Sequence, residues 1–280
     1  MALRITTPVR VRKRLNDLEG REWLPLSKSV WSQRGLGKDH EEAYYEKLHP
    51  APFSFSDVAK LISFFTRAGE AVLDPFVGVA STLKACAVTG RTGVGIELSE
   101  EWSKLGKERL TKEIGPRHGQ RLITGDARRV LKRLPPESFA YVVTSPPYWG
   151  ILNKKADHKT KQERVDKGLK TNYGSDVRDF GNIPDYATFL SELRGLLLSA
   201  AGLLEPKRYM SIIVSDFRHG GTYYDFHADL TKELERDSGL SLQGITILTQ
   251  NAKRLFPYGY PAAYVPNVHH QYILNFRKLT

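Results

Sequence analysis

Cysteine is the scarcest residue type in this chain of 280 residues, which contains only Cys86. A single cysteine excludes an intramolecular disulfide and a metal cluster built from several thiolates. Long hydrophobic runs are also absent, since no stretch of about 18 apolar residues could span a bilayer. The basic segment from Met1 to Arg14 has no apolar block after it, unlike a secretory signal. We therefore expect a cytoplasmic protein that has neither a membrane anchor nor a structural metal.

Acidic residues are outnumbered by basic ones, because 31 Asp and Glu stand against 42 Lys and Arg and give a formal net charge of +11. This excess favours a polyanionic partner such as nucleic acid. A basic enzyme with no such partner fits the charge equally well, so the decision depends on motifs. The length suits one large α/β domain and leaves little room for a second independent one.

Short apolar runs alternate with amphipathic segments from residue 71 onward. The alternation predicts an α/β fold with a doubly wound, mostly parallel sheet of seven strands. The expected strands are Ala71–Asp74, Thr92–Glu97, Arg121–Thr124, Phe139–Thr144, Arg208–Ser215, Gln243–Leu248 and His270–Phe276. We also expect a helix after Ser99, which can cap it, and another from about Asp185 to Leu203.

Two regions depart from this alternation. Residues 1–50 have no clear period and are interpreted as an N-terminal arm packed on a domain of residues 51–280. Residues 150–183 form a long polar insertion, in which Asn153 to Lys170 contain seven basic and three acidic residues. A loop this long inside a compact domain is usually functional or disordered. We expect it to contact a polyanionic partner.

Acidic residues follow three of the predicted strands, at Asp74, Glu97 and Asp126. The first belongs to the turn Asp74-Pro75-Phe76-Val77-Gly78, whose glycine lets backbone approach a ligand. In doubly wound sheets, ligands bind outside the carboxyl ends of the strands, where an acid can accept hydrogen bonds from ribose hydroxyls. A lone acid at such a position is more often a turn former or helix cap. Three of them together predict a nucleoside site.

A second motif, Thr144-Ser145-Pro146-Pro147-Tyr148-Trp149, follows the fourth apolar strand. Two prolines stiffen the backbone and leave carbonyl acceptors without the matching N–H donors. The tyrosine can stack on a flat base. Alone, Pro-Pro-Tyr is most simply a rigid turn with an exposed aromatic ring. Beside a predicted nucleoside site, it indicates a catalytic site for a planar base.

The two motifs together resemble those of the amino-methylating DNA methyltransferases, which act on cytosine N4 or adenine N6. That family carries Asp/Asn/Ser-Pro-Pro-Tyr/Phe and Asp-Pro-Phe-x-Gly, and the resemblance covers nearly the whole chain. His49-Pro50 is similar to the family element that closes over the methionine end of the cofactor. The chain departs from many members in the order of its motifs and at Ala80, where glycine is common. Because of the motif order, the target-recognition region cannot be placed by analogy.

The resemblance implies a Rossmann-like fold and the cofactor S-adenosyl-L-methionine. His49, Pro50, Asp74, Phe76 and Gly78 would surround its methionine portion, Glu97 its ribose and Asp126 its adenine edge, and Pro75 and Ser145 would also bind the cofactor. Ser145 and the Pro146 carbonyl would hold the target amino group, Tyr148 would stack on the base, and Pro147 belongs to the same catalytic turn. No covalent intermediate is required, and Cys86, in an apolar predicted helix, is interpreted as a core residue.

The implied substrate is double-stranded DNA with a flipped base, which the basic insertion would contact. Ser145 favours cytosine N4, because aspartate is more typical of adenine-N6 enzymes; Trp149 either narrows the base pocket or belongs to the core. An RNA or protein amino methyltransferase and a DNA-binding module with an inactive cofactor fold remain as alternatives. The sequence leaves open the oligomeric state and whether a cognate restriction endonuclease exists.

Overall fold

The computed structural model describes residues 14–33, 43–48, 54–150, 176–251 and 253–280. His49, Pro50 and the basic stretch from Asn153 to Lys170 lie outside these ranges, so what the sequence leads us to expect of them stays a prediction.

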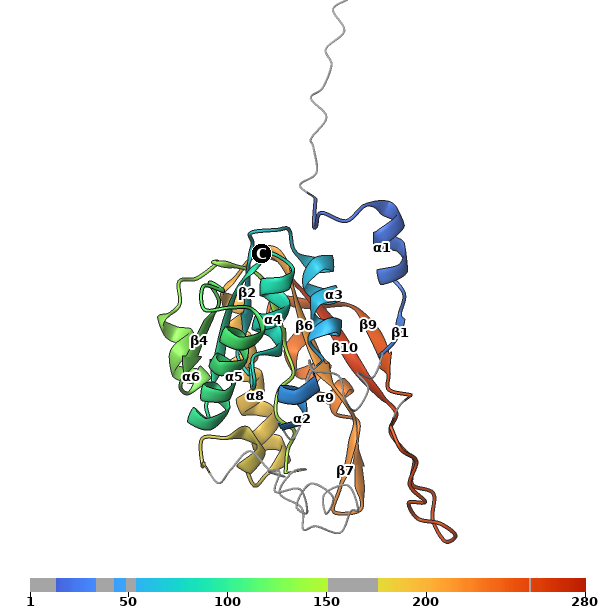
Figure 1. The fold of residues 1–280 in the computed structure, drawn as a ribbon. Coiled ribbons are helices and arrows are strands. Elements are labelled where there is room, and N and C mark those ends of the chain that lie inside the picture. The colour runs from blue at the N-terminus through green and yellow to red at the C-terminus, as the bar shows by residue number, and fades with distance from the viewer. Residues whose placement is uncertain (1–13, 34–42, 49–53, 151–175, 252) are drawn as a thin grey trace, which may run out of the picture.

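One eight-stranded sheet forms the centre of the molecule, in the order β1-β9-β10-β6-β5-β2-β3-β4 (Figure 1). Its strands are β1 Val30–Ser32, β2 Ala71–Asp74, β3 Thr92–Glu97, β4 Arg121–Thr124, β5 Phe139–Thr144, β6 Leu204–Val214, β9 Leu240–Thr249 and β10 His270–Lys278. All neighbouring pairs are parallel except those of β10, which runs antiparallel to both β6 and β9. The other strands therefore point the same way, and their carboxyl ends share one edge of the sheet.

The predicted α/β fold is confirmed, with one strand more than expected. Strands β2 to β5 have the predicted bounds, whereas β6, β9 and β10 are longer than predicted. The additional strand β1 comes from the N-terminal arm and pairs with β9, its Val30 lying opposite Ile247. Only the central residue of β1, Trp31, is buried. Three residues are too few to display an alternating pattern, which is why the sequence did not reveal this strand.

Helices cover both faces of the sheet (Figure 1). They are α1 Gly20–Leu26, α2 Ala43–Leu48, α3 Phe55–Phe65, α4 Ser81–Val88, α5 Glu100–Glu113, α6 Ala127–Val130, α8 Tyr186–Gly202 and α9 Phe226–Glu235, with short 3-10 turns η1 Leu131–Arg133 and η2 Phe180–Asn182. Successive residues of a strand point to opposite faces. Val72 of β2 accordingly packs with Ile62 of α3, and Leu73 packs with Phe189 of α8.

The two predicted helices form, with the predicted cap Ser99 at the start of one and the side chain of Asp185 capping the other. Ser99 Oγ accepts a hydrogen bond from the Trp102 N–H at 3.4 Å, and α5 begins at Glu100. Asp185 accepts one from the Thr188 N–H at 2.7 Å at the start of α8. No helix within the described ranges is long and apolar enough to cross a membrane. A small hairpin of β7 Phe217–His219 and β8 Thr222–Tyr224 follows β6.

Candidate active site

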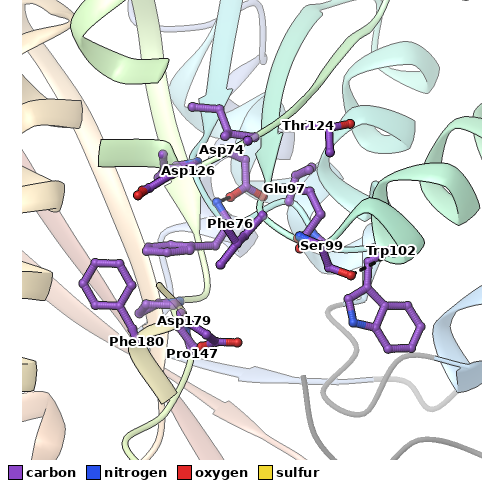
Figure 2. A pocket seen from close by; sticks show the side chains of 18 of the residues that line it. Asp74, Phe76, Glu97, Ser99, Trp102, Thr124, Asp126, Pro147, Asp179 and Phe180 are labelled. Atoms are coloured by element: carbon purple, nitrogen blue, oxygen red, sulfur yellow. Dashed lines mark hydrogen bonds between the residues drawn. The ribbon is translucent and has the colours of Figure 1, made fainter. Parts of the chain in front are cut away.

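A cavity of about 550 Å³ opens at the carboxyl ends of β2, β3, β4 and β5 (Figure 2). It is lined by every predicted site residue that the structure describes: Asp74, Pro75, Phe76, Gly78, Glu97, Asp126, Ser145, Pro146, Pro147 and Tyr148. The fold thus brings the two sequence motifs to a single cavity. The roles that the family resemblance implies for these residues remain predictions.

Asp74, at the end of β2, is 2% exposed and ties the two motifs together. Its carboxylate accepts hydrogen bonds from the hydroxyls of Thr144 at 2.6 Å and Thr82 at 2.5 Å, and from the Phe76 N–H at 3.0 Å. Burial raises the pKa of Asp74 to about 6, against the opposing effect of these three donors. Because Thr144 is the residue before Ser145, Asp74 fixes the turn after β5 relative to the turn after β2.

The turn after β2 needs left-handed backbone at two positions. Gly78 has a φ of 52° and Ala80 a φ of 64°, which costs a residue with a side chain about 1–2 kcal/mol. The departure at Ala80 is therefore accommodated with strain. The buried Arg109 supports the turn, because its guanidinium donates to the Val79 carbonyl at 3.2 Å and to the Ser81 hydroxyl at 2.9 Å.

Glu97, at the end of β3, faces the cavity with both carboxylate oxygens anchored. One accepts the Gly78 N–H at 3.0 Å and the other the Ser99 N–H at 2.8 Å. Each oxygen keeps room for one more donor. Burial beneath the cavity, away from bulk solvent, raises the pKa of Glu97 to about 7. Two adjacent acceptor oxygens suit a pair of neighbouring hydroxyl groups.

Asp126 has both of the roles weighed for it from the sequence, because it caps α6 and also lines the cavity. Its side chain accepts the Arg128 N–H at 2.9 Å and pairs with the Arg128 guanidinium at 3.1 Å. The same guanidinium lies 5.1 Å from the centre of the Phe180 ring. Arg128 therefore connects the end of β4 to the far wall of the cavity.

Ser145 presents an acceptor to the cavity. Its hydroxyl donates to the Ile213 carbonyl of β6 at 3.0 Å, so its only proton is engaged and its lone pairs remain for a ligand. Pro146 and Pro147 have no N–H, so the backbone there can only accept. The turn after β5 is thus suited to bind a group that donates two N–H hydrogen bonds.

Tyr148 lines the cavity beside this turn. Its ring packs edge-on against Phe217 and Phe226, with centroids 6.2 and 6.1 Å away. Burial raises the pKa of its hydroxyl to about 12, which keeps the phenol neutral at physiological pH. The core holds this ring in a fixed orientation at the cavity wall.

Residues that the sequence did not single out complete the cavity. Its far wall comes from Asp176, Arg178, Asp179 and Phe180, at the end of the segment interpreted as an insertion. Phe180 meets Phe76 edge-on at 5.6 Å, as Figure 2 shows. No motif marks this segment. Ser99, Trp102 and Thr124 were missed too, although their places at the carboxyl edge of β3 and β4 could have identified them.

The charge of the cavity is opposite to that of the chain. Its described lining contains seven carboxyl side chains and a single basic one, Arg178. The carboxyl residues are Asp74, Glu97, Glu100, Glu101, Asp126, Asp176 and Asp179. In a chain of net charge +11, such a cluster favours a small cationic ligand over an anionic one.

Two residues weighed from the sequence belong to the core. Cys86 is 0% exposed in α4, and burial raises the pKa of its thiol, so it is not a nucleophile. Trp149 is 9% exposed and donates its indole N–H to the Ile183 carbonyl at 2.9 Å. It faces His219 and Tyr224 and is not part of the described cavity lining, so the core interpretation of Trp149 is the correct one.

A family model described as DNA methylase, covering the N6 and N4 enzymes, matches residues 6–108. The similarity to this family is confined to the matched range. The matched range includes the turn from Asp74 to Gly78 and Glu97, and it ends before Ser145.

Several curated proteins that are similar to parts of this chain are methyltransferases by name. The type II methyltransferase M.HpaI of Haemophilus parainfluenzae is 28% identical over 111 residues, which are 40% of this chain and 33% of that protein. The orphan methyltransferase M.BamHII of Bacillus amyloliquefaciens is 32% identical over 89 residues, or 31% of this chain and 32% of that protein. The matches span no more than a third of either relative.

The fold of this chain also has a solved counterpart. A chain described as an rRNA methylase from Clostridium thermocellum superposes with a TM-score of 0.51, covering 81% of this chain and 97% of that one. At 12% identity, this likeness concerns the α/β fold alone.

Proposed function

We propose that this chain transfers a methyl group from S-adenosyl-L-methionine to an exocyclic amino group of DNA, with cytosine N4 as the acceptor. The observation that carries the proposal is the convergence of Asp74, Glu97, Asp126 and the Ser145 to Tyr148 turn on one cavity. Similarity to the methylase family supports the reaction class.

The cavity suits this cofactor in size, charge and hydrogen bonding. About 550 Å³ is within the usual range for ligand pockets. The sulfonium and ammonium groups of the cofactor are cationic, which fits the excess of carboxyl groups in the lining. Glu97 would accept the two ribose hydroxyls with the lone pairs that its backbone partners leave free. Phe76 and Phe180 would flank the apolar parts of the cofactor.

The residues around Ser145 would activate the amine by accepting hydrogen bonds from its two N–H groups. An exocyclic amine is a poor nucleophile, because its lone pair is delocalised into the ring. The Ser145 oxygen and the Pro146 carbonyl would draw the nitrogen toward a tetrahedral shape and free that lone pair. When bound, the cofactor would supply the electrophilic methyl group, with its sulfur keeping the electrons of the carbon–sulfur bond, and the amine would give up its proton to water. This is catalysis by positioning and preorganised acceptors.

The substrate base would have to leave the duplex, since a stacked base cannot reach a cavity at the edge of a sheet. Tyr148 would stack on the extruded base. We propose cytosine because Ser145 stands where the family has aspartate in most adenine enzymes. This assignment also places the protein with DNA in the cytoplasm.

A methyl-transfer assay tests the reaction. The protein is incubated with radiolabelled S-adenosyl-L-methionine and, separately, with unmethylated duplex DNA, total RNA and a protein extract. We expect label in DNA alone and a loss of about a hundredfold in rate for Ser145→Ala. Ser199→Ala, which removes an exposed hydroxyl on α8, serves as the matched control and should be fully active. Label only in RNA or protein would contradict the DNA substrate, and cofactor binding without any transfer would favour the inactive module.

The identity of the base needs a second measurement. Methylated DNA is digested to nucleosides and examined by mass spectrometry, with N4-methylcytosine as the expected product. If N6-methyladenine were the only product, the choice of base would be wrong, while the cofactor and the reaction class would stand.

A further inference from the structure

A loop of residues 250–269, here called the finger, connects β9 to β10 and extends beyond the body of the domain (Figure 1). Its described residues are held by specific bonds. At its root the Gln250 N–H donates to the His269 carbonyl at 2.7 Å. Farther out, the Asn267 side chain accepts the Phe256 N–H at 2.9 Å and donates to the Phe256 carbonyl at 2.8 Å. The finger therefore has a defined base from which its tip projects.

The finger exposes side chains that monomeric proteins usually bury. Tyr264 is 88% exposed, Tyr260 83% and Leu255 75%. Exposed Lys253 and Arg254 accompany them, and the sequence from residue 250 to 269 contains no acidic residue. Clustered exposed apolar side chains mark interaction surfaces. Aromatic rings combined with basic groups, and without acids, are the composition of a surface that meets nucleic acid.

The root of the finger lies close to the catalytic turn. Since β9 runs parallel to β5, the finger leaves the sheet at the same edge that carries Ser145. Ser215, just after β6, donates to the His270 carbonyl at 3.1 Å, and Ser145 bonds to Ile213 of the same strand. β5 lies two or three strands from β10 and β9, a separation of about 10–15 Å. At about 3.4 Å per base pair, this corresponds to roughly four base pairs along a duplex.

We propose that the finger is the surface that grips duplex DNA beside the target base, an inference that rests on the proposed function. Lys253 and Arg254 contact phosphates near the root. Tyr260 and Tyr264, farther out on the finger, contact bases of the duplex. Charge complementarity selects DNA as the occupant, because the finger offers basic groups and no carboxylate to repel phosphates.

Binding to a short fluorescein-labelled duplex of random sequence, measured by anisotropy at several salt concentrations, tests the proposal. Each phosphate contact contributes about 0.9 to the salt slope, so Lys253→Ala/Arg254→Ala should lower the slope by about 2. Tyr260→Ala/Tyr264→Ala should weaken binding by about fivefold or more at an unchanged slope. Lys132→Ala/Arg133→Ala removes the same charge from exposed residues in η1, in the connection between β4 and β5, and should bind like wild type.

Wild-type binding by either finger variant would overturn the proposal. So would a change of oligomeric state in sedimentation velocity, because the finger would then contact a second copy of the chain. The same variants should keep wild-type affinity for S-adenosyl-L-methionine and show a raised KM for DNA. If wild-type protein methylates DNA while the finger variants behave normally, only the finger proposal fails. If wild-type protein transfers no methyl group but its DNA binding depends on the finger, only the proposed function fails.

Discussion

The cavity and the finger lie along the same edge of the sheet, yet their side chains carry opposite charge. Seven carboxyl groups and one guanidinium line the described cavity, whereas the finger has two exposed basic side chains and no carboxyl group. The cavity is enclosed, and backbone N–H groups donate hydrogen bonds to acids that line it. The finger projects from the domain and exposes its aromatic rings. The difference shows how one edge of the sheet can bind two ligands of opposite charge at separate places. Phosphates are repelled from the cavity, and under the proposed function the groups that enter it are the cationic cofactor and an uncharged base.

The largest effect should come from replacing Glu97, which would impair binding in the cavity but not at the finger. Glu97→Ala loses two hydrogen bonds to a charged acceptor, worth together about 3 kcal/mol or more. Calorimetry should therefore show an affinity for S-adenosyl-L-methionine reduced about a hundredfold or more, with duplex binding unchanged. Glu101→Ala removes the same charge from the cavity lining and should have little effect. Equal losses in both variants would mean that overall charge, and not the geometry of Glu97, holds the cofactor.

Replacing Tyr148 should produce the next largest effect, on both stability and transfer. Tyr148→Ala removes a ring that packs against Phe217 and Phe226, which should cost about 3 kcal/mol of unfolding free energy. It also forfeits about 1–3 kcal/mol of stacking on the base. Tyr148→Phe should retain most of both, as judged by urea denaturation and by the rate of methyl transfer. If Tyr148→Phe proves as inactive as Tyr148→Ala, the hydroxyl and not the ring is essential.

A smaller effect should appear in the pH dependence of binding, which should differ between the cavity and the finger. Below its midpoint, the affinity for the cofactor should change by about tenfold per pH unit. Burial raises the pKa of Glu97 from 4.5 to about 7, and only its charged form can accept two hydroxyl groups. Cofactor affinity should thus fall as the pH drops below about 7, whereas finger-dependent DNA binding by Lys253 and Arg254 should not follow this titration. Titration calorimetry between about pH 6 and pH 8 should give a flat profile for Glu97→Gln.

The same raised pKa has a consequence for folding, with a defined sign. Between pH 4.5 and about 7, the folded chain holds a proton on Glu97 that the unfolded chain has released. The contribution of Glu97 to stability is therefore full below the lower value and is lost as the pH rises through the upper one. Glu97→Gln should remove this part of the pH dependence of thermal unfolding.

The smallest effect should come from the left-handed turn of the cavity. Ala80→Gly relieves about 1–2 kcal/mol of backbone strain but loses a buried methyl group worth about 0.8 kcal/mol and makes the unfolded chain more flexible. We expect a change in unfolding free energy within about 1 kcal/mol. Gly259→Ala is the counterpart in the finger, because Gly259 has a φ of 73° and an added Cβ would overlap the Ala263 carbonyl oxygen. It should weaken DNA binding while leaving the melting temperature of the domain unchanged.

The fold was predictable wherever an element buries a regular pattern. Strands β2 to β5 are short segments with apolar residues at their centres, and their predicted limits agree with the structure. β1 is too short to show a period, and its single buried residue, Trp31, acquires meaning only beside β9. The extensions of β6 and β9 likewise depend on pairing partners distant in the sequence. The periodicity of a sequence reflects burial within one element. It does not indicate which neighbouring strand extends that element.

The sequence indicates which residues meet at the cavity to the extent that strand ends carry motifs, while the roles of these residues remain predictions. Asp74, Glu97, Asp126 and Ser145 follow strands of one parallel sheet, so the topology alone brings them to one edge. The wall containing Asp179 and Phe180 could not be foreseen, because it returns to the cavity from a polar stretch without a period. The engagement of the Ser145 proton by Ile213 was equally hidden, since it depends on the pairing of β5 with β6.

The buried position of Cys86 makes its thiol a probe of local opening of the structure. The only thiol of the chain is 0% exposed between the sheet and the helices of one face, and its raised pKa keeps it uncharged. A thiol reagent can therefore modify the folded protein only when α4 lifts from the strands beneath it. The rate of labelling by such a reagent measures how often that opening occurs. Because α4 begins immediately after the turn that follows β2, the same rate should fall when a ligand fills the cavity.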